Sequence, residues 1–185
     1  IDHVNIKEYK LHLLRKHIGM VLQDVFLFSD SVMNNITLYN SSISEKQVHE
    51  AAIKLGASAF IEQLPEKYHF VVQERGSVLS TGQRQLISFI RAYAYNPSIL
   101  ILDEATANVD SETEDLITKA TENITSKRTS IVIAHRWTTI RNVHKLVVMC
   151  HREIRESGSH TELLKKNSHY KKLFEIQFNT LNNKP

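Results

Sequence analysis

The 185-residue chain is poor in the residues that would place it in several special classes of protein. It has one cysteine, Cys150, so no disulfide framework can form within it, which is compatible with a reducing compartment. Its apolar runs are a handful of residues long, whereas a membrane-spanning helix needs about 20. The formal net charge is only +3, without the basic stripe that nucleic-acid-binding proteins carry. These absences leave a globular domain that is long enough to bury a core without disulfides or metals.

Glycine is also scarce, and this excludes one specific phosphate-binding motif. No G-x-x-x-x-G-K-[ST] sequence, whose backbone N–H groups cradle nucleotide phosphates, can be written from the five glycines. These are Gly19, Gly56, Gly76, Gly82 and Gly158. Because the chain begins at Ile1 rather than at a methionine, we expect it to be a fragment of a longer protein.

Residues 79–110, LSTGQRQLISFIRAYAYNPSILILDEATANVD, form the most informative stretch. Ser80 can cap the N-terminus of a helix, and Gly82 lets a ligand approach that terminus closely. Apolar residues then recur at the i, i+3, i+4, i+7 spacing of a helix with one buried face, and Asn96-Pro97 stops that helix. These apolar positions are Leu86, Phe89, Ile90, Tyr93 and Ala94.

Residues 99–102 follow as a short continuous apolar run, which is typical of a strand buried on both faces of a parallel sheet. The run ends abruptly in Asp103-Glu104. Carboxylates at the carboxyl end of a buried parallel strand lie where open α/β sheets bind ligands. The sequence therefore predicts a ligand site at this edge of an α/β sheet.

Periodicity and capping signals predict the remaining elements. We expect helices over 8–16, 44–55, 57–64 and 111–124, strands over 18–22, 129–134 and 145–150, and a turn or hairpin over 153–158. The two later strand segments read as buried runs, so Cys150 is expected to be a buried strand residue rather than a reactive thiol.

The order of LSTGQ, ILILDEA and ANVD resembles the signature, Walker B and D-loop motifs of ATP-binding cassette (ABC) transporter nucleotide-binding domains, and the exporter type most closely. Gln23 after the first strand and His135 after the third match the Q-loop and H-loop of that family. The resemblance implies a RecA-like P-loop NTPase parallel sheet with an inserted small α-helical subdomain. It assigns residues 1–40 and 97–185 to the core, and residues 41–96 to the helical subdomain.

The resemblance also implies roles for the polar residues at the strand ends. Asp103, with Gln23, would hold Mg²⁺, and Glu104 would be the general base that orients the attacking water. His135 would contact the γ-phosphate and hold the water and Glu104 in place. Gln23 would also lie near that water, which makes Glu104, His135 and Gln23 the implied catalytic residues.

The implied contacts to ATP come from the signature and the D-loop. Ser80, Thr81, Gly82 and Gln83 open a helix whose N-terminus would cap the ATP held by an opposite subunit, and Asp110 would reach the same interface. The chain departs from the family pattern at three positions. Threonine replaces the first glycine of the signature at position 81, alanine stands where serine is commoner at position 107, and glutamine replaces glycine at position 73.

The implied partners are the transmembrane domains of an exporter, contacted through the Q-loop 23–31 and the X-loop 73–76. A second nucleotide-binding domain would complete a head-to-tail dimer on the cytoplasmic face of the cell membrane, with no role for nucleic acid. The tripeptide beginning at Asn35 matches the glycosylation pattern, but we expect no modification in a cytosolic chain.

The missing phosphate-binding motif leaves alternatives open. In the family, the P-loop strand lies between the strand that ends at His135 and the strand over 146–149, so its absence would leave two strands without a neighbour. We therefore expect the isolated chain to bind ATP poorly and not to hydrolyse it. The main alternative is a non-catalytic module that acts in protein interaction. A chromosome-associated ABC ATPase is disfavoured, because residues 24–78 lack the long heptad repeats of that class.

Overall fold

The computed structural model describes most of the chain, in two compact units formed by residues 1–135 and 136–185. The described residues are 1–103, 111–126, 128–134, 139–140, 143–166 and 169–182. The expected division into a core (1–40 and 97–185) and a helical subdomain (41–96) follows different boundaries and stays a prediction. None of the helices in the described ranges combines the length and the hydropathy needed to cross a bilayer.

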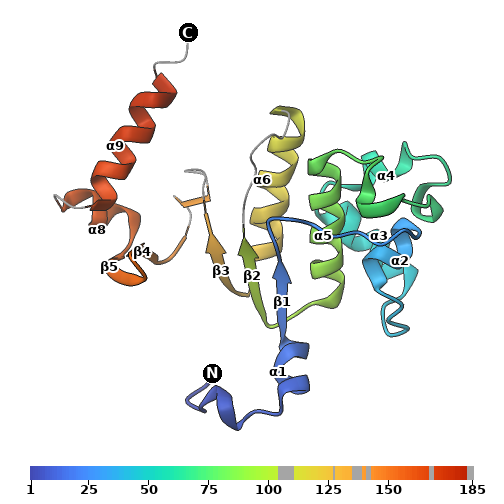
Figure 1. Ribbon diagram of the computed structural model, residues 1–185, viewed down its shortest axis with the longest axis horizontal. Coiled ribbons are helices and arrows are strands. Elements are labelled where there is room, and N and C mark those ends of the chain that lie inside the picture. The colour runs from blue at the N-terminus through green and yellow to red at the C-terminus, as the bar shows by residue number, and fades with distance from the viewer. Residues whose placement is uncertain (104–110, 127, 135–138, 141–142, 167–168, 183–185) are drawn as a thin grey trace. The chain divides into compact units, whose positions relative to one another are not determined.

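Three parallel strands form the sheet of the first unit, in the order β1 (Ile18–Val21), β2 (Ile99–Asp103) and β3 (Thr129–Ile133) (Figure 1). Parallel strands need long crossover connections, and here these carry the helices. In the central strand β2, Leu100 and Leu102 are buried, while the alternate residues are partly exposed. The predicted α/β class with a parallel sheet is thus confirmed.

The prediction of a buried strand over 129–134 is wrong for β3. Ile131 and Ile133 are 56% and 49% exposed. Within the described residues, β3 is hydrogen-bonded to β2 alone and lies at one edge of the sheet. An apolar run shows that a strand favours burial, but only its neighbours decide whether the strand is covered.

The longest helices of the first unit are α5 and α6, and α5 lies between the sheet and the smaller helices (Figure 1). The helices of this unit are α1 (Leu11–His17), α2 (Val32–Thr37), α3 (Glu45–Lys54), α4 (Ser58–Glu62), α5 (Thr81–Tyr95) and α6 (Ser111–Thr125). The predicted stripe is confirmed in α5, where Leu86, Phe89 and Ile90 are buried. At the end of α5, Asn96 adopts the left-handed conformation with φ of 46°, and Pro97 follows.

Local signals place most helix ends correctly. Ser44 and Gln47 form the capping box that opens α3. The helix predicted over 8–16 begins later, at Leu11, because Lys10 is extended with ψ of 124°. Short 3-10 turns occupy Ile6–Glu8, Lys67–His69 and Glu74–Gly76.

The second unit is a hairpin followed by two helices. Strands β4 (Leu146–Cys150) and β5 (Glu153–Gly158) pair antiparallel around a turn at residues 151–152. The expected turn or hairpin over 153–158 is therefore the second strand of a hairpin that begins at Leu146. Helices α8 (His160–Lys165) and α9 (His169–Asn182) follow. Cys150 is exposed, so its predicted burial is wrong. Cys150 is the last residue of β4, and its neighbour Met149 is exposed as well.

Candidate functional site

The three parallel strands end at the same edge of the sheet. The register pairs Val21 of β1 with Leu102 of β2, and Asp103 of β2 with Ile133 of β3. Gln23 lies two residues beyond the end of β1 and is exposed. The structure therefore brings the ends of all three motif-bearing strands together, as expected for a ligand-binding edge of a parallel sheet.

Asp103 and Gln23 carry the polar side chains of this edge that the structure describes. Asp103 is partly exposed at the last position of β2. Neither side chain hydrogen-bonds to another described residue, so the carboxylate and amide oxygens are free for a ligand. Oxygen donors of this kind, together with water, suit Mg²⁺. Within the described residues, no three His, Cys, Asp or Glu side chains cluster closely enough to hold a metal ion among themselves.

Three predicted site residues, Glu104, Asp110 and His135, lie outside the described residues. In the sequence, Glu104 directly follows Asp103, and His135 comes two residues after the end of β3. Their proposed roles stay predictions.

The start of α5 is held by a capping box that leaves hydrogen-bond donors available. Ser80 Oγ accepts from the Gln83 backbone N–H at 3.2 Å, and Gln83 Oε1 accepts from the Ser80 N–H at 3.0 Å. Both side chains therefore use an oxygen as acceptor, so the Ser80 hydroxyl proton and the Gln83 amide N–H groups can still donate. The first turn of α5 carries no acidic residue, and its end of the helix dipole is positive. This arrangement suits an anion.

Arg84 fixes the loop that precedes this helix start. Its Nη1 donates to the Leu79 carbonyl at 2.6 Å, and its Nη2 donates to Thr81 Oγ1 at 3.0 Å. The hydroxyl that replaces a glycine at position 81 is thus bonded within the chain. Gly76 of the X-loop lies against the same arginine, because a Cβ there would be 3.0 Å from Arg84 Cδ and 3.0 Å from Leu27 Cδ1.

Backbone hydrogen bonds join the Q-loop to the strand-like segment just before the X-loop. Val32 N–H donates to the Phe70 carbonyl at 3.0 Å, and Val72 N–H donates to the Asp30 carbonyl at 2.9 Å. Ser31 and Val71 form an antiparallel bridge between these two bonds. The two segments that were expected to contact transmembrane domains therefore lie side by side.

The side chain of Asn35 holds the Q-loop in place by hydrogen bonds, and the sequence alone did not predict this role. Its fully buried side chain accepts from the Phe28 N–H at 2.7 Å and donates to the carbonyls of Phe28, Asp30 and Ser31 at 3.0–3.3 Å. The sequence showed only the start of a glycosylation tripeptide at this position. No local pattern distinguishes a buried loop-holding asparagine from an exposed one.

Two aromatic side chains project from this loop. Phe26 and Phe28 are each 54% exposed, and their rings meet edge to face with centroids 5.0 Å apart. Beside them is a cavity of about 360 Å³, lined by Phe28, Asp30, Asn34, Leu38 and Tyr39. Exposed aromatic side chains next to a small apolar cavity are typical of a protein–protein contact surface.

Comparisons with known proteins agree with this geometry. A family profile described as "ABC transporter" matches residues 1–107. The chain is 46% identical over 180 residues to the "Uncharacterized ABC transporter ATP-binding protein YknV" of Bacillus subtilis (strain 168), which covers 97% of this chain and 30% of that protein. It is 46% identical over 178 residues to an "ATP-dependent lipid A-core flippase" of Syntrophus aciditrophicus (strain SB), covering 96% and 30%.

A solved structure described as a bacterial Atm1-family ABC exporter with ATP bound is also similar, with a TM-score of 0.86 and 36% sequence identity. The match covers 96% of this chain and 31% of that chain. The chain thus spans about 30% of the length of the relatives it matches.

Proposed function

Because this chain belongs to the ABC transporter family, we propose that it forms part of the ATP-hydrolysing nucleotide-binding domain of an exporter. The observation that carries this proposal is the common edge of β1, β2 and β3, where Gln23 and Asp103 present oxygens that no described residue engages. In the sequence, Glu104 follows Asp103 directly and His135 follows the last residue of β3 by two positions. The family implies nucleotide binding, and Mg²⁺ is the cation that these oxygen donors suit.

The proposed chemistry divides the polar residues of this edge by role. Asp103, with Gln23, holds the hydrated Mg²⁺, which supplies neutralising charge for the phosphates when bound. Glu104 accepts a proton from the attacking water, and His135 donates a hydrogen bond to the γ-phosphate. Successive residues of a strand direct their side chains to opposite faces, so the proposal gives the neighbouring residues Asp103 and Glu104 different partners.

The capped start of α5 has a separate role in the proposal. Ser80, Thr81, Gly82 and Gln83 present donors toward the phosphates of ATP held by a second nucleotide-binding domain, and Asp110 belongs to the same head-to-tail interface. The free Ser80 hydroxyl proton and the absence of an acidic residue in the first turn support this role.

The joined Q-loop and X-loop form the proposed contact with transmembrane domains. The surface combines the exposed rings of Phe26 and Phe28 with the exposed residues 73–75 of the X-loop. Because Ser31 and Val71 pair directly before the X-loop, a displacement of one loop is transmitted to the other. This contact would hold the chain at the cytoplasmic face of the membrane.

The role of Glu104 is tested in a polypeptide that joins this chain to a phosphate-binding P-loop segment. Glu104→Gln keeps the shape of the side chain but removes the base, so phosphate release should fall about 10²–10⁴-fold while ATP binding is retained. Glu50→Gln, which removes an exposed carboxylate paired with Lys46, is the matched control and should keep full turnover. Undiminished turnover in Glu104→Gln would remove Glu104 from its role.

The 185-residue chain without upstream sequence should bind ATP weakly and show no turnover, because no phosphate-cradling glycine motif is present in it. Isothermal titration calorimetry measures the affinity. Micromolar binding, with turnover that Glu104→Ala abolishes, would contradict this expectation. The same missing motif is what favours the alternative of a non-catalytic interaction module, and an upstream sequence without a P-loop would select that alternative.

A further inference from the structure

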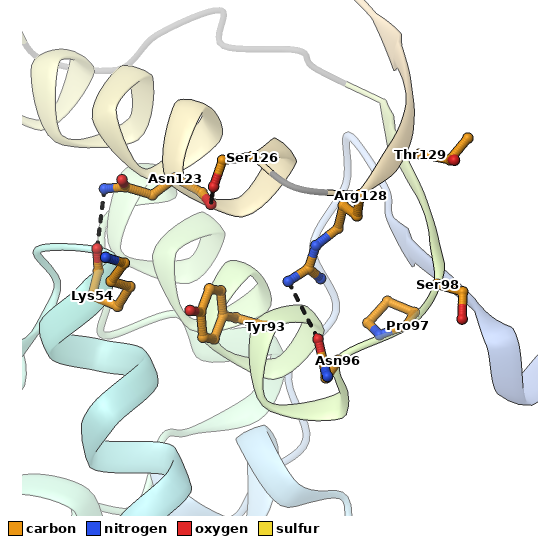
Figure 2. A pocket seen from close by; sticks show the side chains of 9 residues that line it. All are labelled: Lys54, Tyr93, Asn96, Pro97, Ser98, Asn123, Ser126, Arg128 and Thr129. Atoms are coloured by element: carbon orange, nitrogen blue, oxygen red, sulfur yellow. Dashed lines mark hydrogen bonds between the residues drawn. The ribbon is translucent and has the colours of Figure 1, made fainter.

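We propose a second binding site in this chain, a pocket for an oxyanion at the edge of the sheet opposite to the candidate nucleotide site. A cavity of about 780 Å³ opens there, where β2 and β3 begin (Figure 2). Its principal side chains are Lys54, Tyr93, Asn96, Asn123, Ser126 and Arg128. They come from the ends of α3, α5 and α6 and from the start of β3, so one ligand would contact all four elements.

The charge of the pocket favours an anion. Lys54 and Arg128 are the two charged side chains among the nine residues that line it, and none of the nine is acidic. Neither cation forms an ion pair with any residue that the structure describes. Two unpaired positive charges around one cavity attract an oxyanion more strongly than an isolated surface lysine does.

Arg128 is already held in place for such a ligand. Its guanidinium carbon lies 5.5 Å from the centre of the Tyr93 ring, and its Nη2 donates to Asn96 Oδ1 at 3.5 Å (Figure 2). The other terminal nitrogen, Nη1, is buried and has no hydrogen-bond partner among the described residues. A buried donor without an acceptor is unfavourable, so a turn of the guanidinium that brings this nitrogen to an oxyanion in the cavity would remove that penalty.

The rest of the pocket wall is fixed by hydrogen bonds within the chain. Asn123 Nδ2 donates to the Lys54 carbonyl at 3.0 Å and joins α6 to the end of α3. Ser126 Oγ donates to the Asn123 carbonyl at 2.8 Å. These two bonds fix the side chains of Asn123 and Ser126, and the two cations supply the charge that would hold an anionic ligand.

The helix ends around the pocket are unfavourable for binding an anion. The C-terminal ends of α3, α5 and α6 carry partial negative charge, and cations near them also serve as favourable counter-charges. A purely structural role of Lys54 and Arg128 predicts lower stability on their removal but no dependence on added anion. The ligand-binding role predicts an anion-dependent stabilisation that disappears with them.

The chemical class of ligand is a small carboxylate or phosphate compound, since both present paired oxygens to a guanidinium. The test measures thermal unfolding of the full 185-residue chain with citrate or inorganic phosphate, at constant ionic strength set with chloride. Unfolding should shift upward in a saturable way, by roughly 3–6 °C at ten times the Kd. A larger shift with citrate than with phosphate would select a carboxylate ligand, and the reverse would select a phosphate ligand.

Variants assign the effect to the pocket. Arg128→Gln should abolish the anion-dependent shift, and Lys54→Gln should weaken the affinity severalfold. Lys46→Gln, which removes an exposed cation from the same helix α3, should leave the shift unchanged. If Arg128→Gln does not fold, Arg128→Lys keeps the charge and Lys54→Gln lies at a helix end, so both still report on the site. The absence of a saturable shift in the unaltered chain would overturn the proposal. So would an anion-dependent shift in Arg128→Gln and Lys54→Gln as large as that of the unaltered chain.

Discussion

Arg91 and Asn35 connect the signature helix to the helix behind the Q-loop: Arg91 Nε donates to the Asn35 carbonyl at 2.8 Å. One turn further along α5, the Tyr95 hydroxyl donates to the Thr37 carbonyl at 3.0 Å. Both acceptors belong to the end of α2, whose last carbonyls have no partner within the helix. Since the Asn35 side chain holds Phe28, the C-terminal part of α5 and the Q-loop are joined through a continuous set of hydrogen bonds.

Replacing Arg91 should therefore destabilise the first unit. Burial lowers the pKa of Arg91 from its ordinary value, and only its planar fork reaches the Asn35 carbonyl in this geometry. Arg91→Lys keeps a cation but loses that geometry, so the free energy of unfolding should fall by about 1–3 kcal/mol. Urea denaturation measures the change. Arg155→Gln, which breaks an exposed ion pair with Glu153, should change it by less than about 1 kcal/mol. An equal loss of unfolding free energy in Arg91→Lys and Arg155→Gln would show that the contact from Arg91 to Asn35 does not stabilise the fold.

Asn35→Ala should have a larger effect, because it leaves the N–H and C=O groups of the Q-loop without partners. We expect the free energy of unfolding to fall by about 2–4 kcal/mol, from the lost hydrogen bonds and the cavity together. Asn40→Ala is the control, since Asn40 accepts only local bonds from Ser42 near the surface. Hydrogen exchange should show faster exchange of the Phe28 amide in Asn35→Ala and not in Asn40→Ala. Unchanged protection of Phe28 would contradict the role of Asn35.

Gly76→Ala separates backbone strain from packing in the X-loop. Gly76 has φ of +68°, and an added Cβ would lie 3.0 Å from atoms of both Arg84 and Leu27. Gly56 has a similar φ of +71°, but its nearest neighbour would be Leu116 Cδ2 at 3.8 Å. Both alanine variants should lose about 1–2 kcal/mol from the left-handed backbone. Gly76→Ala should lose a further 1–3 kcal/mol or so from overpacking. Equal denaturation midpoints for the two variants would argue against close packing at Gly76.

Asp30 should make the stability of the Q-loop region depend on pH. Its pKa is lowered below the ordinary value near 3.8, chiefly by the hydrogen bond from the Tyr39 hydroxyl, then by those from Asn34 and the Ser31 N–H. A lowered folded-state pKa gives stability that is present above the unfolded-state pKa and is lost as the pH falls through the folded-state value. The stability difference between the unaltered chain and Asp30→Asn should thus be constant near neutrality and shrink below about pH 4.

Urea denaturation between pH 3 and pH 7 measures that difference. Asp24→Asn is the control for removing one negative charge from the same loop, because Asp24 accepts no hydrogen bond within the described residues. Parallel pH profiles for the unaltered chain and Asp30→Asn would contradict the assignment.

The sequence was sufficient for the elements whose signals are local. The strand over 99–103 and the helix that begins after Ser80 and ends at Asn96 follow from an apolar run, a capping residue and a helix-stopping pair. The order of the motifs was likewise enough to identify the family, because a motif is a property of the chain. The register that brings Asp103 beside Ile133 confirms that the corresponding strands are neighbours.

The tertiary structure decided everything that depends on residues distant in the chain. Arg91 and Asn35 are 56 positions apart, and no periodicity or spacing predicts that one holds the other. Burial is decided in the same way, since Ile131 and Ile133 of β3 are exposed at a sheet edge although the apolar run of β3 resembles that of β2. Capping and periodicity are set by neighbours within one turn, whereas burial and buried hydrogen bonds are set by which surfaces the fold brings together.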